Sequence, residues 1–564
     1  MSLHKVVFLG IITLLCLNGA AQEKSLVNNL RSDTIDVLDY QIELNFLDIA
    51  NENMVAKSRV KFEAKMNGVS SISLDLLALT IDSVKQGQQQ ISFSYNDTLL
   101  VANFISAIDA GDIDSVTVFY RGTPQTDPSG LGGFYFMGGG AFNFGVGLTA
   151  QPHNYGRVWH PCFDNFVERA TYDMTFITPN QLSAYSAGLI EEESIDGNGN
   201  NVRRWIMEDP IQSYLMGFAI YDYTHVSDTY TSISGDEIPI MLVARPQDTT
   251  GIKSSFINLK NALAAYEDAY GPYIWDKVGY FFVPFSSAAM EHATGVIYPQ
   301  AIATGNLQFE TIMAHELSHH WWGNLLTCKT ASDMWINEAF ATYSEPLFLE
   351  YVYAYENYLS SLRSTHRQVI QQAHFDDGAF LPLSGVPASA TYGTHTYRKG
   401  ATVVHNLRTY LGDNLFFSGI KDLFENHAFS SMDAEEFKNA LSNYTGFNLD
   451  AFFEGWILNP GYPGFNIDSF TVENTGADYA IELFVKQRLH QAPNFFENVP
   501  MEVTIVDEDM NEFSTNIMVD GENTVATINS PIEPSMIYLN KKRWCFLTRL
   551  LVKIECTQAL VFKT

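Results

Sequence analysis

The stretch His315-Glu316-Leu317-Ser318-His319, followed by Asn337-Glu338, decides what kind of domain this sequence builds. Apolar residues recur at helical spacing over residues 311–325, so the stretch is predicted to be helical. Two histidines four residues apart on a helix project from one face, and their ring nitrogens can share a metal ion. Glu316 lies one step round this helix, where it can act on a metal-bound water without being a ligand. The pattern predicts a zinc site with His315 and His319 as ligands.

The third zinc ligand is predicted to be Glu338. A second helix is expected from Met334 onward, with Ser332 and Asp333 as its N-cap. Eighteen residues separate His319 from Glu338, which is enough for a turn and a returning helix that brings the carboxylate to the same ion. Three protein ligands leave the fourth position of a tetrahedral zinc for water, as a catalytic zinc requires.

Two nearby side chains are candidates for supporting roles. Glu345 follows Glu338 by seven residues, two helical turns on the same face. It is a candidate to hydrogen-bond the second nitrogen of a ligand histidine, and an exposed helix charge is the alternative. His320 lies about 100° round the helix from His319, so it is expected to pack or support rather than bind the same metal.

The zinc motif and its continuation resemble the gluzincin aminopeptidases, the aminopeptidase N and leukotriene hydrolase family. Ala288-Ala289-Met290-Glu291-His292 resembles the Gly-Ala-Met-Glu-Asn exopeptidase motif of that family. Tyr397-Arg398-Lys399-Gly400 resembles its Tyr-x-Lys-Gly motif, and residues 157–164 resemble its Ala-Arg-x-x-Phe-Pro-Cys-x-Asp segment. The resemblance covers roughly residues 35–540, and the motifs occur in the same order.

The resemblance implies one Zn²⁺ per chain and assigns roles to further residues. Glu316 would be the general base, and Tyr397 would stabilise the transition state. Glu291 would bind the free α-ammonium of a peptide substrate, which makes the enzyme an exopeptidase. The substrate-binding residues implied are Glu291, Ala288, Ala289, Met290 and, near the substrate-facing Gln of the family, Gln151.

Two residues of the exopeptidase motif depart from the family pattern. Ala288 stands where the family has Gly, and the added methyl group is expected to narrow or shift the substrate cleft. His292 stands where the family has Asn, and its imidazole is expected to alter the pH dependence near neutrality. Both departures leave Glu291 in place.

Composition limits the classes of partner. The chain has 564 residues, so two to four domains are expected, and its 46% hydrophobic and 17% charged residues are those of a globular protein. Asp and Glu outnumber Lys and Arg by 64 to 33, for a net charge of −31. This balance argues against nucleic acid and anionic membrane surfaces as partners.

Residues 1–21 have the pattern of a secretory signal peptide. A basic start, an apolar run from Val6 to Leu17 and small residues before Gln22 predict cleavage after Ala21. The protein is therefore predicted to be secreted, periplasmic or extracellular, with no stable membrane insertion after the signal is removed. Four scattered cysteines remain and do not form a disulfide framework, so Cys162 and Cys328 are predicted to be buried free thiols.

Residues 22–229 are predicted to form a β-rich domain. Apolar and polar residues alternate there, as in Tyr40–Phe46 and Ser115–Tyr120, which is typical of antiparallel strands with one wet face. The glycine-rich stretch Gly130–Gly147 is predicted to be a loop, because no Lys-Ser/Thr pair or helix follows it.

Helical periodicity marks residues 230–463 as a catalytic domain, with single helices predicted over Thr249–Tyr270 and Glu345–Leu362. Alternation returns in 464–540, which is predicted to be a small β-sandwich. Residues 541–564 form an atypical basic tail of unknown status. The fold class predicted is multidomain α+β, and the family implies an N-terminal β-saddle domain and a thermolysin-like α/β-plus-helical catalytic domain.

The leading functional hypothesis is a secreted zinc aminopeptidase that acts on peptides with a free N-terminus. One alternative is the epoxide hydrolase activity of the leukotriene branch, which the same zinc site would serve. The other is a non-catalytic binding protein derived from the family.

Overall fold

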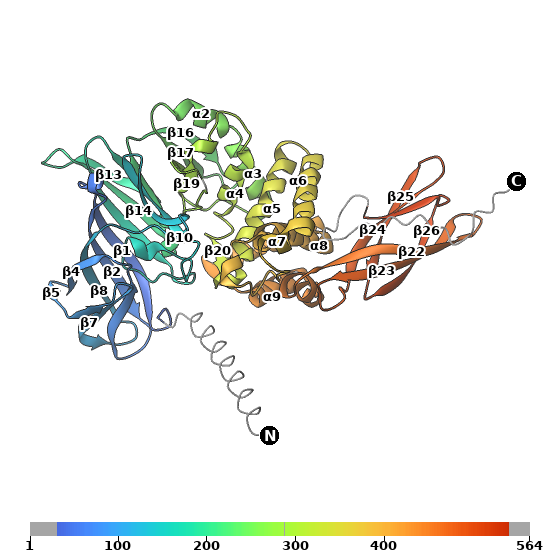
Figure 1. Ribbon diagram of the computed structural model, residues 1–564, viewed down its shortest axis with the longest axis horizontal. Helices are drawn as coiled ribbons and strands as arrows, with labels where there is room; N and C mark the ends of the chain where they lie inside the picture. Colours follow the sequence, from blue (N-terminus) through green and yellow to red (C-terminus); the bar gives the residue numbers. More distant parts are fainter. Residues whose placement is uncertain (1–30, 287, 541–564) are drawn as a thin grey trace, which may run out of the picture. The chain divides into compact units, whose positions relative to one another are not determined.

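The computed structural model describes residues 31–286 and 288–540 (Figure 1). The described chain forms two compact units that divide between Tyr223 and Thr224. The predicted signal peptide, residues 1–21, and the predicted basic tail, residues 541–564, lie outside the described residues.

The first unit is built on an eight-stranded sheet with the order β13-β14-β11-β1-β2-β8-β4-β5. Along β2, buried Val60 and Phe62 alternate with exposed Lys57 and Arg59, so one face forms core and the other meets water. Neighbouring strands pair antiparallel, except β1 and β11, which are parallel. The strands are β1 (Ile35–Asn45), β2 (Met54–Ala64), β4 (Thr80–Gln86), β5 (Gln89–Gln90), β8 (Ile113–Gly122), β11 (Ala170–Thr178), β13 (Leu189–Ile195) and β14 (Asn201–Ile211).

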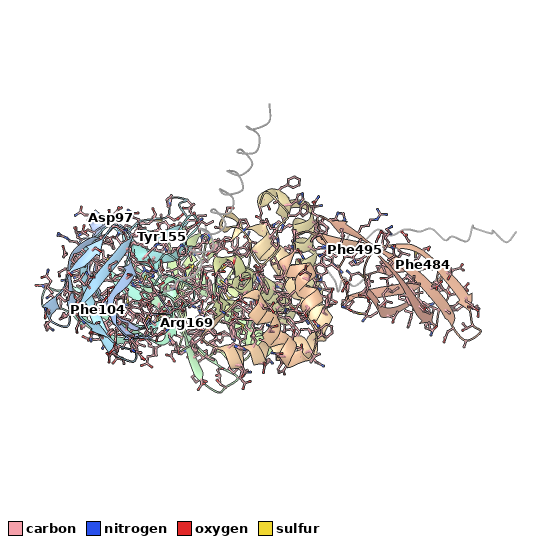
Figure 2. The ribbon with its side chains drawn as sticks, turned by 90° about the horizontal axis from the view of Figure 1, so that it is seen from below. Asp97, Phe104, Tyr155, Arg169, Phe484 and Phe495 are labelled. Atoms are coloured by element: carbon pink, nitrogen blue, oxygen red, sulfur yellow. The ribbon has the colours of Figure 1, made fainter. Side chains whose placement is uncertain are left out.

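Two smaller sheets complete this unit. Phe104, which Figure 2 labels, belongs to the three-stranded sheet. Its ring stacks on that of Phe62 of β2, with ring centroids 5.3 Å apart. The sheets have the orders β3-β7-β6 and β12-β15-β10-β9. Their strands are β3 (Val69–Asp75), β6 (Phe93–Tyr95), β7 (Leu99–Ile108), β9 (Gly132–Met137), β10 (Gly140–Gly147), β12 (Ser183–Ser186) and β15 (Phe218–Tyr221).

The prediction of a loop over Gly130–Gly147 is wrong, because β9 and β10 form a hairpin there. Its turn residues Gly138 and Gly139 have φ of 62° and 81°, which glycine adopts without strain. At Gly140 a side chain would overlap the carbonyl oxygen of Ile220 on β15. The strand β10 can therefore pair with β15 only if residue 140 is glycine. Phe134 of this hairpin is buried and packs in the core. The many glycines around it obscured this apolar position in the sequence.

The family segment at residues 157–164 folds around the fully buried carboxylate of Asp164. Asp164 pairs with Arg157 at 3.0 Å and accepts hydrogen bonds from the Gly156 amide and the Ser213 hydroxyl. Cys162 and Cys328 are free and buried, which confirms the prediction for these two thiols.

The second unit begins with a four-stranded sheet of order β16-β17-β18-β19, comprising β16 (Thr224–Thr231), β17 (Glu237–Ala244), β18 (Val278–Val283) and β19 (Val296–Pro299). The single helix predicted over Thr249–Tyr270 is wrong. The segment forms α2 (Thr249–Ser255) and α3 (Leu259–Tyr270). The break lets Phe256 pack edge-on against Tyr280 and Phe282 at 4.8 and 5.2 Å, so tertiary packing overrides the helical periodicity.

Helices α4 (Glu310–Ser318) and α5 (Trp335–Val352) follow. The predicted N-cap at Ser332 and Asp333 is wrong. Both residues belong to the 3₁₀ turn η5 (Ala331–Asp333), where the Asp333 carboxylate accepts a hydrogen bond from the Trp335 indole. The single helix predicted over Glu345–Leu362 is also wrong, because extended Ala354 separates α5 from α6 (Tyr355–Gln368).

Of the remaining helical elements, α6, α8 and η8 pack against α5 (Figure 1). Helix α8 bends at Gly412, where φ is 73°. A capping box between Asp433 and Glu436 starts α9. The elements are η6 (Val369–Ala373), α7 (His374–Asp376), η7 (Ala388–Ala390), η8 (His395–Lys399), α8 (Gly400–His427), α9 (Ala434–Thr445), α10 (Asp450–Phe452) and η9 (Phe453–Leu458), with the short strands β20 (Leu326–Cys328) and β21 (Ser430–Met432).

Two three-stranded sheets end the described chain, with the orders β22-β23-β26 and β25-β24-β27. Inward residues such as Leu483 and Val503 are fully buried. The strands are β22 (Tyr462–Asn474), β23 (Tyr479–His490), β24 (Val499–Val506), β25 (Glu512–Val519), β26 (Asn523–Ser530) and β27 (Met536–Leu539). The multidomain α+β fold class predicted from the sequence is confirmed. No helix within residues 31–286 and 288–540 combines the length and apolar character needed to cross a membrane.

Candidate active site

Three predicted ligands meet between α4 and α5. His315 lies in the last turn of α4, His319 directly follows this helix, and Glu338 lies in the first turn of α5. The two Nε2 atoms are 3.2 Å apart, and Glu338 Oε2 lies 3.6 Å from His315 Nε2 and 3.4 Å from His319 Nε2. Metal bonds of about 2.0–2.1 Å at tetrahedral angles would place ligand atoms roughly 3.4 Å apart. The triangle of donor atoms therefore has the size that one zinc-like ion requires.

The hydrogen bonds made by these three ligand residues also suit a bound cation. His319 Nδ1 lies 2.7 Å from the carbonyl oxygen of Trp322, so Nδ1 carries the proton and the Nε2 lone pair faces the cluster. His315 Nδ1 lies 3.1 Å from Glu345 Oε1. Glu338 Oε2 is buried without a hydrogen-bond partner among the described residues. Converging lone pairs and an unpartnered buried carboxylate oxygen fit a bound metal ion.

Charge interactions in the cluster shift the pKa of each acid. Burial raises the pKa of Glu338, but the two histidines outweigh it and lower that pKa to about 2. Burial raises the pKa of Glu316 to about 7, which the nearby Glu291 and Glu338 reinforce and the histidines oppose. Opposite charges therefore favour the carboxylate form of Glu338, whereas burial favours the protonated form of Glu316.

Glu291 lies in the loop between β18 and β19, and its side chain is close to that of Glu316 on α4. One ligand atom from each of Glu291, Glu316 and His319 lies within 4.8 Å of the other two. Met290 is buried and exchanges two 2.9 Å backbone hydrogen bonds with Ile297, which fixes the loop next to Glu291.

Other parts of the exopeptidase motif lie around this loop. Asn324 Nδ2 donates to the Glu291 carbonyl oxygen at 3.0 Å. Ala288 and Ala289 are half-buried, and His292 is fully buried. The predicted effects of Ala288 and His292 on the cleft and on pH dependence stay predictions.

Tyr397 approaches the cluster from η8. Its ring lies nearly parallel to that of His315, with centroids 6.3 Å apart. Burial, reinforced by the charge of Glu338, holds the pKa of Tyr397 well above its usual range, so the phenol stays protonated and can donate a hydrogen bond. Next to it is a cavity of about 220 Å³ lined by Thr342, Glu345, Tyr392, Gly393, Thr394, Tyr397 and Arg398.

Gly400 in the same motif has a steric reason to be glycine. A Cβ there would lie under 3.0 Å from the Cβ of Ala339 and 3.2 Å from its Cα. Ala339 directly follows the metal-cluster residue Glu338. Glycine therefore lets the start of α8, and with it Tyr397, approach the cluster end of α5.

The remaining predicted residues differ in where they lie. Glu345 contacts His315, as the two-turn spacing predicts. His320 bonds Tyr273 at 2.9 Å through Nδ1 and is not among the described residues whose ligand atoms converge, while burial lowers its pKa to about 3. Gln151 is exposed in the first unit, and its contact with substrate stays a prediction.

Asn337 was quoted in the sequence motif, but its role was missed. Its Oδ1 accepts a 3.0 Å hydrogen bond from the Cys328 amide, and its Nδ2 donates to Thr327. These bonds tie the first turn of α5 to β20. An Asn directly before a metal-binding Glu was the available signal.

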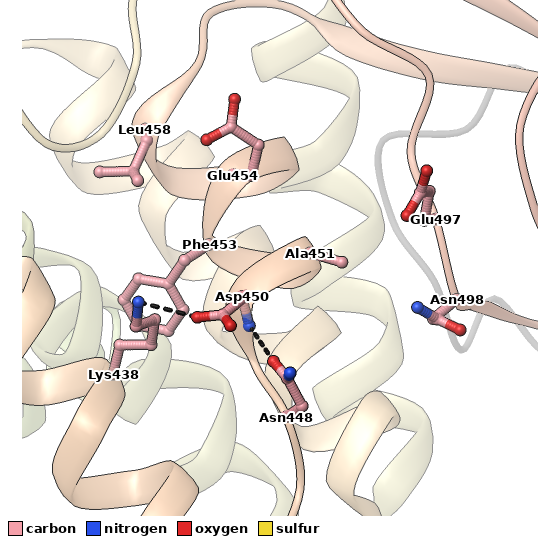
Figure 3. A pocket seen from close by; sticks show the side chains of 9 residues that line it. All are labelled: Lys438, Asn448, Asp450, Ala451, Phe453, Glu454, Leu458, Glu497 and Asn498. Carbon is pink, nitrogen blue, oxygen red and sulfur yellow. Dashed lines mark hydrogen bonds and ion pairs between the residues drawn. The ribbon is translucent and has the colours of Figure 1, made fainter.

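A larger cavity of about 610 Å³ lies elsewhere in the second unit (Figure 3). Lys438 on α9 crosses it to pair with Asp450 at 2.8 Å. Its lining is Lys438, Asn448, Asp450, Ala451, Phe453, Glu454, Leu458, Glu497 and Asn498, which includes no histidine or cysteine. Size alone therefore does not identify the candidate active site.

Comparison with known proteins agrees with this geometry. The model of the peptidase M1 N-terminal domain matches residues 37–215, and that of the peptidase family M1 domain matches residues 255–456. The chain belongs to peptidase family M1, which confirms the resemblance seen in the sequence.

Among relatives, aminopeptidase N of Bos taurus is 27% identical over an alignment of 409 residues, and the match covers 66% of this chain and 41% of that protein. Probable aminopeptidase 1 of Sulfurisphaera tokodaii is 22% identical over an alignment of 543 residues, and the match covers 89% of this chain and 63% of that protein. The chain spans less than two thirds of the length of these curated relatives.

Solved structures share the fold. The M1 zinc metallopeptidase from Deinococcus radiodurans has a TM-score of 0.66 and 18% identity, covering 75% of this chain and 94% of that one. Legionella pneumophila aminopeptidase A has a TM-score of 0.75 and 17% identity, covering 92% and 60% of the two chains.

Proposed function

We propose that this protein is a zinc-dependent aminopeptidase that removes the first residue of peptides with a free N-terminus. The observation that carries the proposal is the set of donor atoms from His315, His319 and Glu338, separated by 3.2–3.6 Å. Zn²⁺ bound to them would lower the pKa of a water and polarise the scissile carbonyl. The M1 family assignment and the aminopeptidase relatives support the same reaction.

Glu316 would take the proton from the attacking water and deliver it to the leaving amine. The residue directly follows the ligand His315, so its carboxylate can reach a water held by the same ion. Tyr397 would donate a hydrogen bond to the oxyanion that forms on the substrate. Donors of this kind contribute about 2.7–4 kcal/mol to the transition state.

Glu291 would restrict the enzyme to the chain terminus. Its buried carboxylate lies within 4.8 Å of cluster atoms, so a substrate ammonium bound to it leaves the first peptide bond at the metal. A peptide with a blocked amine would leave this carboxylate buried without a cation, which is costly.

Export from the cell is part of the proposal. The pattern of residues 1–21 supports a signal peptide, and the acidic composition supports a soluble product with peptide rather than nucleic-acid partners.

A panel of aminoacyl-arylamides tests the function on the full chain. We expect release of arylamine that a chelator abolishes and added zinc restores. Glu316→Gln should keep its zinc and lose about 10²–10⁴-fold in kcat. Equal cleavage of N-acetylated peptides would exclude an exopeptidase, and full activity of Glu316→Gln would exclude this base.

A further inference from the structure

We propose that His395 and Lys399 are positioning residues for Tyr397. They hold it in place through hydrogen bonds to the backbone N–H and C=O groups of Leu381, a pair of bonds called here the grip on Leu381. The proposal rests on the function proposed above, because it assigns Tyr397 a role in catalysis. His395 and Lys399 lie two residues before and two residues after Tyr397, within the single π-helical turn η8.

Leu381 is bound from both sides. Its N–H donates to His395 Nε2 at 3.2 Å, and its carbonyl oxygen accepts from Lys399 Nζ at 2.8 Å. Both gripping side chains are buried, with exposed fractions of 3% and 2%. The segment that precedes η7 thus fixes the turn that carries Tyr397 at two points, one on each side of the tyrosine.

Asp377 sets the tautomer of His395 that this grip needs. Because the Leu381 N–H is a donor, His395 Nε2 must be the acceptor, and the ring proton lies on Nδ1. Asp377 Oδ2 is 2.6 Å from Nδ1 and accepts a hydrogen bond from the Nδ1–H group. The same carboxylate accepts the backbone N–H groups of Thr394 and His395 at 2.9 and 2.7 Å. His395 is therefore fixed in orientation and in tautomer.

Lys399 is unusual because it is a fully buried amine bound to a carbonyl oxygen. Burial lowers the pKa of Lys399 to about 7. Burying a cationic group costs stability unless strong contacts compensate. A methionine would fill the same volume without that cost, so the bond to Leu381 is the feature that the lysine adds.

The opposite side of the turn is fixed by close packing. Gly400 allows α8 to approach Ala339, so η8 is held between Leu381 and α5, the helix that carries Glu338. A hydrogen-bond donor must be held within a fraction of an ångström of the forming oxyanion to stabilise it. The grip on Leu381 supplies the restraint that α5 alone does not give.

Two substitutions of His395 separate the grip from simple packing. In His395→Gln the side-chain oxygen can still accept from Leu381, whereas in His395→Asn the amide can reach only Asp377. We expect His395→Asn and Lys399→Met to lower kcat by about 10–100-fold with little change in KM, since a misplacement of about 1 Å costs roughly 10²-fold. His395→Gln should retain most of the activity. Lys438→Met, which removes a lysine of α9 at the larger cavity, should behave as wild type.

A Tyr397→Phe background provides the decisive readout. If His395 and Lys399 act through the tyrosine, their substitution in Tyr397→Phe should cost less than about twofold further, because coupled effects are not additive. A full additional loss in that background, a rise in KM alone, or equal damage from His395→Gln and His395→Asn would overturn the proposal.

Hydrogen–deuterium exchange gives an answer that does not depend on activity. Residues 378–385 and 393–399 should exchange faster in His395→Asn and Lys399→Met than in wild type, while α3 is unchanged. If residues 378–399 exchange deuterium at the same rate in these variants as in wild type, the proposed hydrogen bonds to Leu381 are refuted, even if the enzyme is active. If wild type has no peptidase activity but the exchange changes as expected, the grip stands and the proposed function fails. If Lys399→Met does not fold, the two His395 variants decide.

Discussion

Adding one methyl group at Gly400 tests whether close approach of α8 to α5 sets the position of Tyr397. The new Cβ would lie under 3.0 Å from Ala339 Cβ, whereas carbon atoms in contact prefer about 3.5–4.0 Å. The two helices would have to separate by roughly 1–1.5 Å. Such overpacking costs about 1–3 kcal/mol of stability, and a shift of about 1 Å at a catalytic group costs roughly 10²-fold in rate.

The assay compares kcat/KM on an aminoacyl-arylamide with the melting temperature and zinc content of the same samples. We expect Gly400→Ala to lose 10–100-fold in kcat/KM while it keeps its zinc, because the ligands lie on α4 and α5 and not on α8. Gly251→Ala is the matched control, since its Cβ would meet the nearest atom at an ordinary 3.7 Å.

A second substitution can restore the space. In Gly400→Ala with Ala339→Gly, the methyl group moves from one helix to the other, and activity should recover in part, although glycine within α5 costs about 1 kcal/mol of stability. Unchanged activity in Gly400→Ala, or failure of Ala339→Gly to restore any of it, would refute the steric reasoning.

Three further outcomes are expected. Tyr397→Phe should lower kcat by about 10²–10³-fold with KM nearly unchanged, which steady-state kinetics would measure; a loss confined to KM would contradict its role as an oxyanion donor. Glu345→Ala should weaken zinc binding by about 10–100-fold in a chelator competition, while Ala at exposed Glu356 of α6 should not. Burial raises the pKa of Asp377, but hydrogen bonds from His395 and Thr394 outweigh it and lower that pKa. The carboxylate therefore stabilises the fold above its unfolded pKa of about 3.9 and loses this effect as the pH falls through the folded value. The difference in unfolding free energy between wild type and Asp377→Asn should shrink at pH values below about 4; a difference independent of pH would contradict the assignment.

The metal cluster could be predicted from the sequence because its geometry is local. The spacing of His315 and His319 on one helix fixes their separation. The position of Glu345 follows from the two turns of α5 that separate it from Glu338. The turns that break helices could not be predicted, because Phe256 leaves its helix only to pack on strands that are distant in the sequence. The β9–β10 hairpin was missed for a similar reason: its glycines make room for β15, which lies about 80 residues away.

The contacts around Tyr397 were also beyond prediction. The motif Tyr397-Arg398-Lys399-Gly400 suggests a role for the tyrosine, but nothing in it points to Leu381 or Asp377. Those partners depend on a loop that folds back over η8, which only the tertiary structure defines.

The proposed function depends on one zinc ion held by His315, His319 and Glu338. Anomalous X-ray scattering from crystals of the full chain, recorded on both sides of the zinc absorption edge, tests it most directly. We expect a single strong peak about 2.0–2.2 Å from both histidine Nε2 atoms and a Glu338 oxygen. A peak bound by other residues, or none in zinc-loaded crystals, would contradict it.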